Sequence, residues 1–155
     1  GEDRRKPVTV NNDGSGAKAV LLYLHGGSML LGFLLMAAGF TAARYFRQRR
    51  SWFPIHRRFG VAGAAAVVAG FTAALFMVTL GGGSHFGVPH GKAGAAAVLA
   101  SVLTPLLGQL QFTLRSRAAV LRRRHRQAGY VTLVLVALTA LSGLALVGVL
   151  PGPGP

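Results

Sequence analysis

The sequence predicts an all-α membrane protein, an antiparallel up-down bundle of four transmembrane helices. Of the 155 residues 52% are hydrophobic and only 13% are charged, about half the charged share of a typical soluble domain. The apolar residues form four runs long enough to cross a bilayer, which takes about 20 residues in a helix. Because nucleic-acid-binding domains do not carry four such runs, the net charge of +14 does not indicate binding to nucleic acid.

The four spans are expected near residues 19–46, 54–80, 88–113 and 126–150, and together they form one domain over residues 19–150. Short connections between long helices favour antiparallel neighbours, so the four spans should run up, down, up and down. Pro105 lies inside the third span and predicts a kink there.

The two ends of the chain are not expected to be helical. Residues 1–18 are polar, and VNNDGSG within them is typical of a linker. The tail PGPGP at 151–155 cannot continue the fourth helix, because proline lacks the amide hydrogen and fixes φ. The membrane-spanning domain is therefore expected to lie between two irregular segments.

Positive charge is concentrated around two of the three connections. Twelve of the seventeen Lys and Arg residues surround the first and third connections, whereas the second contains only Lys92. By the positive-inside rule the first and third connections are cytoplasmic, and both termini are then exoplasmic. The twelve are Arg44, Arg47, Arg49, Arg50, Arg57, Arg58, Arg115, Arg117, Arg122, Arg123, Arg124 and Arg126.

Four of the five histidines lie near ends of the predicted spans. His25 and His90 are placed near the exoplasmic ends of the first and third helices, and His56 and His125 at the cytoplasmic ends of the second and fourth. Alternate helices of a four-helix bundle are diagonal partners. Each pair should therefore face across the bundle core, with a gap suited to a flat ligand.

Small residues follow each histidine at helical spacings of three and four, which place them on the same helix face. A porphyrin lying against a helix needs such missing side chains, but small residues also let membrane helices pack tightly without a cofactor. Both interpretations stay open at this point. The stripes are Gly32 and Gly39 after His25; Gly60, Gly63, Val67 and Gly70 after His56; Gly94, Ala97, Ser101 and Gly108 after His90; and Gly129, Thr132, Val136, Thr139 and Gly143 after His125.

The rest of the composition excludes several chemical roles for these histidines. All three acidic residues precede the first span, so a proton relay lacks its usual carboxylates, and the absence of cysteine excludes thiolate metal sites. Zinc would need four ligands at one site. Metal ligation satisfies one imidazole nitrogen, and a backbone or hydroxyl group can hold the other. Two b-type haems, each with two histidine ligands, fit the number and pairing of the histidines.

Several motifs resemble the four-helix core of the eukaryotic-type cytochrome b561 family. They are LHGGSMLLGFLLMAAGFTAARYFR, WFPIHRRFG, HGKAG followed by LTPLLGQLQ, and RRRHRQAGY. The most similar branch carries this core after an extracellular DOMON domain and includes ferric-chelate-reductase-like proteins. The resemblance covers about residues 19–149. It implies that His25 and His90 bind an exoplasmic haem and that His56 and His125 bind a cytoplasmic one.

The resemblance also implies a function, a transmembrane oxidoreductase. Electrons would pass from a cytoplasmic donor such as ascorbate to an exoplasmic ferric chelate, monodehydroascorbate or partner redox domain. Members of the family carry further flanking spans, so we expect this chain to be part of a longer protein or one subunit of a larger assembly. The alternative is a structural, anchoring or cytochrome b subunit of a larger membrane complex, with partial or no haem.

Two cations are candidates for binding a cofactor or an anionic substrate. Arg44 lies at the end of the first helix, beside the predicted cytoplasmic haem, and Lys92 follows His90 by two residues. Either side chain suits a haem propionate. His85 in the second connection is favoured as an ordinary loop histidine, with binding of an acceptor, a metal or a propionate as the alternatives.

Overall fold

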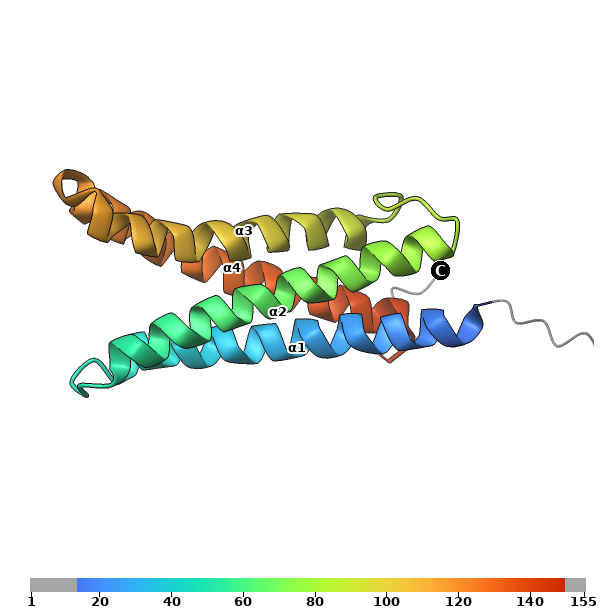
Figure 1. Ribbon diagram of the computed structural model, residues 1–155, viewed down its shortest axis with the longest axis horizontal. Coiled ribbons are helices and arrows are strands. Elements are labelled where there is room, and N and C mark those ends of the chain that lie inside the picture. Colours follow the sequence, from blue (N-terminus) through green and yellow to red (C-terminus); the bar gives the residue numbers. More distant parts are fainter. Residues whose placement is uncertain (1–13, 150–155) are drawn as a thin grey trace, which may run out of the picture.

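The computed structural model describes residues 14–149, which form four long helices (Figure 1). No strand occurs in this part of the chain. All four helices are long and apolar enough to cross a membrane, so the protein is an all-α, multi-pass membrane protein, as the sequence predicts. The helices are α1 (Ser15–Tyr45), α2 (Trp52–Leu80), α3 (Pro89–Thr113) and α4 (Ala118–Leu146), with a 3₁₀ turn, η1 (Arg115–Arg117), before α4.

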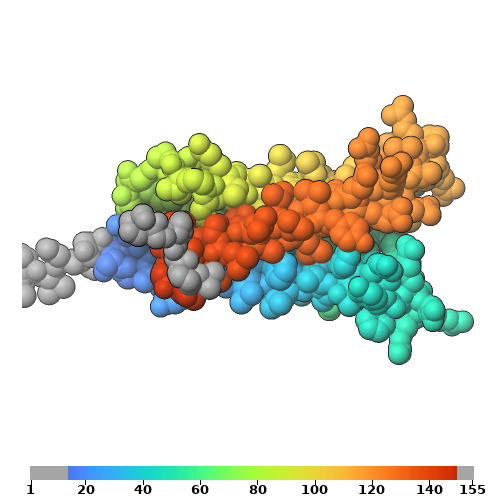
Figure 2. All heavy atoms as spheres, turned by 180° about the vertical axis from the view of Figure 1, so that it is seen from behind, coloured from blue at the N-terminus to red at the C-terminus, as the bar shows by residue number. Residues whose placement is uncertain are grey.

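The helices form two antiparallel hairpins that lie side by side (Figure 1). α1 packs extensively along α2, and α3 along α4, whereas the hairpins meet less extensively through α2 with α3 and α1 with α4. α1 and α3 are therefore diagonal partners, as are α2 and α4. The arginine-bearing connections α1–α2 and α3–α4 lie at one end, here called the arginine end, where the two hairpin tips stand apart (Figure 2).

Glycines bring α1 and α2 into backbone contact. A Cβ on Gly32 would lie 2.9 Å from the carbonyl oxygen of Gly63, and a Cβ on Gly63 would lie 2.9 Å from the carbonyl oxygen of Gly32. Gly39 and Gly70 occupy similar positions nearer the two ends, with carbonyl oxygens of the opposite helix 3.2 and 3.1 Å from their Cβ sites. These four glycines of the predicted stripes are therefore explained by tight helix packing alone.

The other stripe residues also face the bundle interior, as their spacing predicts. The most buried side chains of the described chain include Val67, Ala97, Ser101, Thr132 and Val136, all at 3% exposure or less. Most large apolar side chains face outward instead, which suits a bundle surrounded by lipid rather than water. The interior is thus lined with small and hydroxyl-bearing residues.

Two predicted boundaries are wrong. α1 begins at Ser15, so the last residues of the predicted linker are helical; residues 1–13 and the tail at 150–155 lie outside the described residues. The third connection is shorter than expected, because α4 begins at Ala118 and not near Arg126. Arginine is a good helix former, so the arginine run extends the helix instead of ending it. α3 continues through Pro105.

Candidate functional site

The bundle brings four histidines together as two pairs, one toward each end. The ring centroids of His25 on α1 and His90 on α3 are 6.2 Å apart, and those of His56 on α2 and His125 on α4 are 5.8 Å apart. The rings are steeply inclined in both pairs, at 86° and 78°. We call these the terminal pair and the arginine-end pair. Each pair joins diagonal helices and bridges the two hairpins, as the topology argument predicts.

In the first hairpin both histidines donate a hydrogen bond from Nδ1 to the opposite helix. Nδ1 of His25 lies 2.9 Å from the carbonyl oxygen of Gly70, and Nδ1 of His56 lies 2.9 Å from that of Gly39. A carbonyl oxygen can only accept, so each Nδ1 carries the ring hydrogen. The Nε2 atoms are then the unprotonated nitrogens.

In the second hairpin (α3 and α4), Nδ1 of one histidine is bonded directly to a backbone carbonyl, and Nδ1 of the other reaches a carbonyl through a serine hydroxyl. Nδ1 of His125 lies 2.9 Å from the carbonyl oxygen of Thr104. Nδ1 of His90 lies 2.8 Å from Oγ of Ser142, whose own hydrogen is donated to the carbonyl of Thr139 at 2.8 Å. Ser142 therefore accepts from His90. Within residues 14–149, all four paired histidines thus have Nδ1 held and Nε2 without a hydrogen-bond partner.

Two glycines make room for the histidine rings of the second hairpin. A Cβ on Gly108 would lie 3.0 Å from Cε1 of His125, and a Cβ on Gly143 would lie 3.0 Å from Cε1 of His90. In both cases the ring is also tied, directly or through Ser142, to the carbonyl one helical turn before that glycine. The opposite helix therefore fixes the position of each ring and the direction of its Nε2 atom.

The glycines that follow three of the histidines by four residues have a different environment. Gly60 and Gly129 are half-buried and Gly94 is buried. Yet a Cβ on Gly60 would have no heavy atom within 4 Å, and a Cβ on the other two would meet a threonine methyl group only at 3.9 or 4.0 Å. Helix packing does not account for these three glycines. Each lies one helical turn from a paired histidine, and the space beside Gly60 is open.

The spacing of the two rings in each pair would suit a metal ion held by two imidazole ligands. Metal–nitrogen bonds of about 2.0 Å to both rings would place the ring centroids roughly 6 Å apart, in agreement with both pairs. No group of three or more His, Cys, Asp or Glu side chains lies together in the described part of the chain. A bare zinc ion would therefore lack ligands, whereas haem iron needs only two from the protein. The residues present fit two haems.

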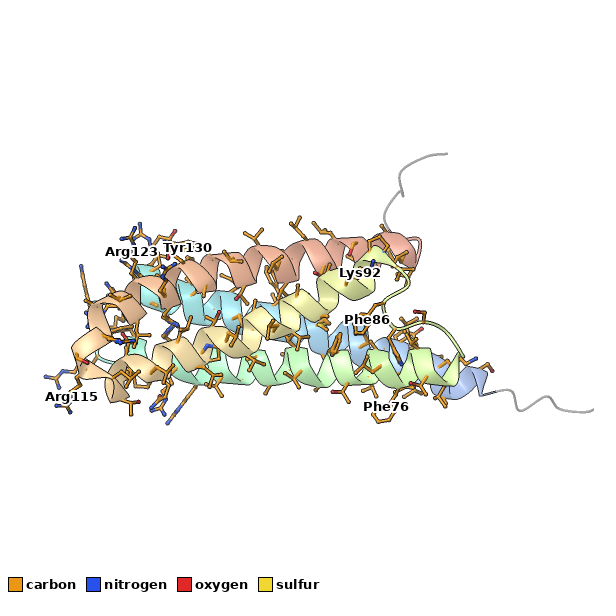
Figure 3. The ribbon with its side chains drawn as sticks, turned by 90° about the horizontal axis from the view of Figure 1, so that it is seen from above. Phe76, Phe86, Lys92, Arg115, Arg123 and Tyr130 are labelled. Atoms are coloured by element: carbon orange, nitrogen blue, oxygen red, sulfur yellow. The ribbon has the colours of Figure 1, made fainter. Side chains whose placement is uncertain are left out.

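Within residues 14–149, neither candidate cation has a hydrogen bond or ring contact that ties it to a histidine pair. The guanidinium carbon of Arg44, in the last turn of α1, lies 5.4 Å from the ring centroid of Tyr45. Lys92 is exposed in the first turn of α3 (Figure 3). No carboxylate occurs in residues 14–149 to pair with either, because the acids of the chain all lie within its first thirteen residues. Their roles stay predictions.

Sequence reasoning predicted that a backbone or hydroxyl group holds the second ring nitrogen, but it did not identify which residues do so. Ser142 lies 52 residues from His90, and Thr132 and Thr139 of the same span also carry hydroxyl groups, so the sequence does not single it out. Comparisons with protein-family models, with curated proteins and with solved structures found no match for this chain. A functional assignment therefore depends on the two histidine pairs and on the motifs around them.

Proposed function

We propose that this protein carries single electrons across a membrane through two b-type haems. The terminal pair would hold one haem and the arginine-end pair the other. The observation that supports this most is the double pairing of diagonal histidines, 6.2 and 5.8 Å apart, with Nδ1 held and Nε2 free at all four. The motifs that resemble the cytochrome b561 family point to the same ligand pairs.

Bound haem would supply one-electron chemistry, and the chain's own residues would hold it and set its environment. A hydrogen bond from Nδ1 to a carbonyl fixes the ring and makes Nε2 more basic, which favours ferric iron. The middle of the bundle is filled by buried Val67, Ala97 and Val136. Ser101 and Thr132 are buried too, so the bundle interior holds hydroxyl groups as well as apolar side chains.

The charge distribution suggests the orientation. Twelve arginines surround the connections at the arginine end, and no acid in residues 14–149 offsets them. By the positive-inside rule this end is cytoplasmic and both termini are exoplasmic. We infer a cytoplasmic donor such as ascorbate and an exoplasmic acceptor such as a ferric chelate, monodehydroascorbate or a DOMON-type redox domain. The chain would then be an oxidoreductase of that type.

A second candidate is a structural or anchoring subunit of a larger membrane complex. The backbone contact of α1 with α2 at Gly32 and Gly63 favours this candidate, because the two helices pack closely there without a cofactor between them. The two candidates predict different absorption spectra for the purified protein, since only the first requires haem in every molecule.

An absorption spectrum of the purified protein tests the proposal. Two haems per chain are expected in a pyridine haemochrome assay, with an α-band in the reduced protein. His56→Ala and His125→Ala should each remove the same single haem, and the double variant should lose no more. A colourless preparation would refute the proposal. If His56→Ala and His90→Ala behaved as the equivalent pair instead, the ligand assignment would be wrong.

A further inference from the structure

A hollow of about 380 Å³ lies at the tip of the first hairpin, where α1 ends and α2 begins. Its walls come only from these two helices and the connection between them, and none of the four paired histidines lines it. The tip of this hairpin stands apart from the tip of the second (Figure 2). The walls include Ala38, Phe46, Arg49, Ser51, Trp52 and Ile55.

The hollow opens on the outward face of the bundle. Phe40 of α1 contacts Tyr130 of α4, with ring centroids 5.1 Å apart, so this side of α1 faces the second hairpin. Ala38 lies two residues earlier, and two residues turn a helix by about 200°. Ala38 therefore faces away from the second hairpin, and it is exposed, as are Phe46 and Ile55. In a membrane this face is covered by lipid.

Positive charge without a counter-ion stands at one end of the hollow. Arg49 is the charged residue of the lining, and Arg47 adds a second cation, because its guanidinium carbon lies 5.4 Å from the ring centroid of Trp52. Residues 14–149 contain no Asp or Glu, and the three acids of the sequence precede α1, which begins at the opposite end of the bundle. The hydroxyl of Ser51 makes no capping hydrogen bond to α2. Guanidinium and hydroxyl groups together suit a phosphate.

The apolar and cationic parts of the hollow follow each other along the helix axis. Ala38 and Phe46 are eight residues apart on α1, which is about 12 Å along that axis, and Arg49 comes next in the connection. Trp52 begins α2 at the same end, and tryptophan is typical of the level where head groups meet acyl chains. An amphiphile with its tail beside Ala38 would therefore have its head group beside Arg49.

We propose that this hollow binds an anionic glycerophospholipid, with its phosphate at Arg49 and Ser51 and one acyl chain beside Ala38 and Ile55. Some acyl chain covers this outward face in any bilayer, so the head group is the part that the site selects. Phosphatidylcholine brings its own cation, whereas the net negative charge of phosphatidylglycerol offsets the guanidinium groups. A soluble anion would use the cationic end of the hollow and leave its apolar walls unused.

The sequence supplies its own probe, because Trp52 is the only tryptophan of the chain and lies in the wall of the hollow. The purified full chain is reconstituted in phosphatidylcholine that contains a small fraction of brominated phosphatidylglycerol or of brominated phosphatidylcholine with the same acyl chains. Bromine quenches tryptophan fluorescence on contact. Each protein is compared with itself in unbrominated lipid, so absorption by any bound haem cancels.

The quenching should show a preference of about fivefold or more for phosphatidylglycerol. Measurement in about 0.5 M NaCl shortens the Debye length to roughly 4 Å, which screens arginines outside the hollow. Arg49→Gln should reduce the preference to less than about twofold, and Arg49→Lys, which keeps the charge, should retain most of it. Ala38→Leu fills an exposed part of the hollow and should lower quenching by brominated phosphatidylglycerol while the helices stay intact.

Arg115→Gln is the matched control, because it removes the same charge at the tip of the second hairpin (Figure 3). This variant should behave like the original protein. Equal quenching by both lipids, an unchanged preference in Arg49→Gln, or the same loss in Arg115→Gln would overturn the proposal. Displacement by soluble glycerol 3-phosphate as effective as that by unbrominated phosphatidylglycerol would also overturn it, since the site would then bind free anions.

The hollow does not require haem, so this proposal and the proposed function fail separately. A colourless chain that prefers phosphatidylglycerol refutes electron transfer through haem but not this site. A chain with two haems and no lipid preference refutes this site alone.

Discussion

Replacing Gly60 with alanine separates the two explanations for the small residues that follow the histidines. A Cβ at this position would have no heavy atom within 4 Å, so the methyl group enters free space in the protein alone. Alanine inside a helix is favoured over glycine by about 0.5–1 kcal/mol. If no cofactor occupies this space, the variant should be slightly more stable and otherwise unchanged.

If the arginine-end pair holds a haem, Gly60→Ala should instead weaken haem binding. Carbon atoms prefer separations of about 3.5–4.0 Å, so a porphyrin in contact with the Gly60 backbone must move by roughly 1 Å to accept a methyl group. Overpacking of this kind typically costs about 1–3 kcal/mol, which corresponds to a loss of haem affinity of about fivefold to 150-fold. The loss should be confined to the haem of this pair.

The assay is haem content per chain, together with the rate at which haem transfers to excess apomyoglobin, and circular dichroism to follow the helices. Gly32→Ala is the control for packing, because its Cβ would lie 2.6 Å from Cγ2 of Val67 and 2.9 Å from a backbone oxygen. That variant should destabilise the whole bundle and lower both haems together. If Gly60→Ala retains both haems with unchanged affinity, the free space beside His56 is not porphyrin space.

Three further predictions follow from the geometry. Gly108→Ala places a Cβ about 3.0 Å from the ring of His125 and should broaden or remove the spectrum of one haem only; loss of both would contradict a local effect. Ser142→Ala removes the acceptor of His90 Nδ1 and should raise the reduction potential of one haem by about 40 mV, the equivalent of about 1 kcal/mol, in a potentiometric titration; an unchanged potential would mean that this bond does not tune the iron. Since the chain lacks cysteine, a cysteine at Arg50 should resist an impermeant maleimide in intact cells while one in the α2–α3 connection reacts, and the reverse result would invert the orientation.

The four helices and the histidine pairs could be predicted from the sequence, because few arrangements of four short-connected helices are possible in a bilayer. A span needs about 20 apolar residues, and short connections force neighbours to run antiparallel. In that topology the four histidines of the spans share a membrane level only as His25 with His90 and as His56 with His125. The topology predicts which histidines pair, whereas the ring-centroid separations of 6.2 and 5.8 Å also depend on helix rotation and on the distance between the hairpins.

The sequence does not determine which stripe glycines touch a neighbouring helix. Gly60 and Gly63 are three residues apart and share the face that follows His56, yet a Cβ on Gly63 would lie 2.6 Å from the side chain of Met36 while one on Gly60 meets nothing. The difference depends on the distance between hairpins and on helix rotation, which spacing does not encode. The early start of α4 was missed for another reason: charge at an aqueous helix end does not stop a helix.

The hydrogen bonds of the histidines explain why a ligand at each pair would matter for the whole bundle. Every paired histidine is anchored within its own hairpin: His25 and His56 to the other helix of the first hairpin, and His90 and His125 to the other helix of the second. Their unpartnered Nε2 atoms belong to rings that approach across the hairpin boundary, where the helices contact each other least. Two metal centres at these positions would therefore join two preformed units, and each ligand bond would also be a bond between hairpins.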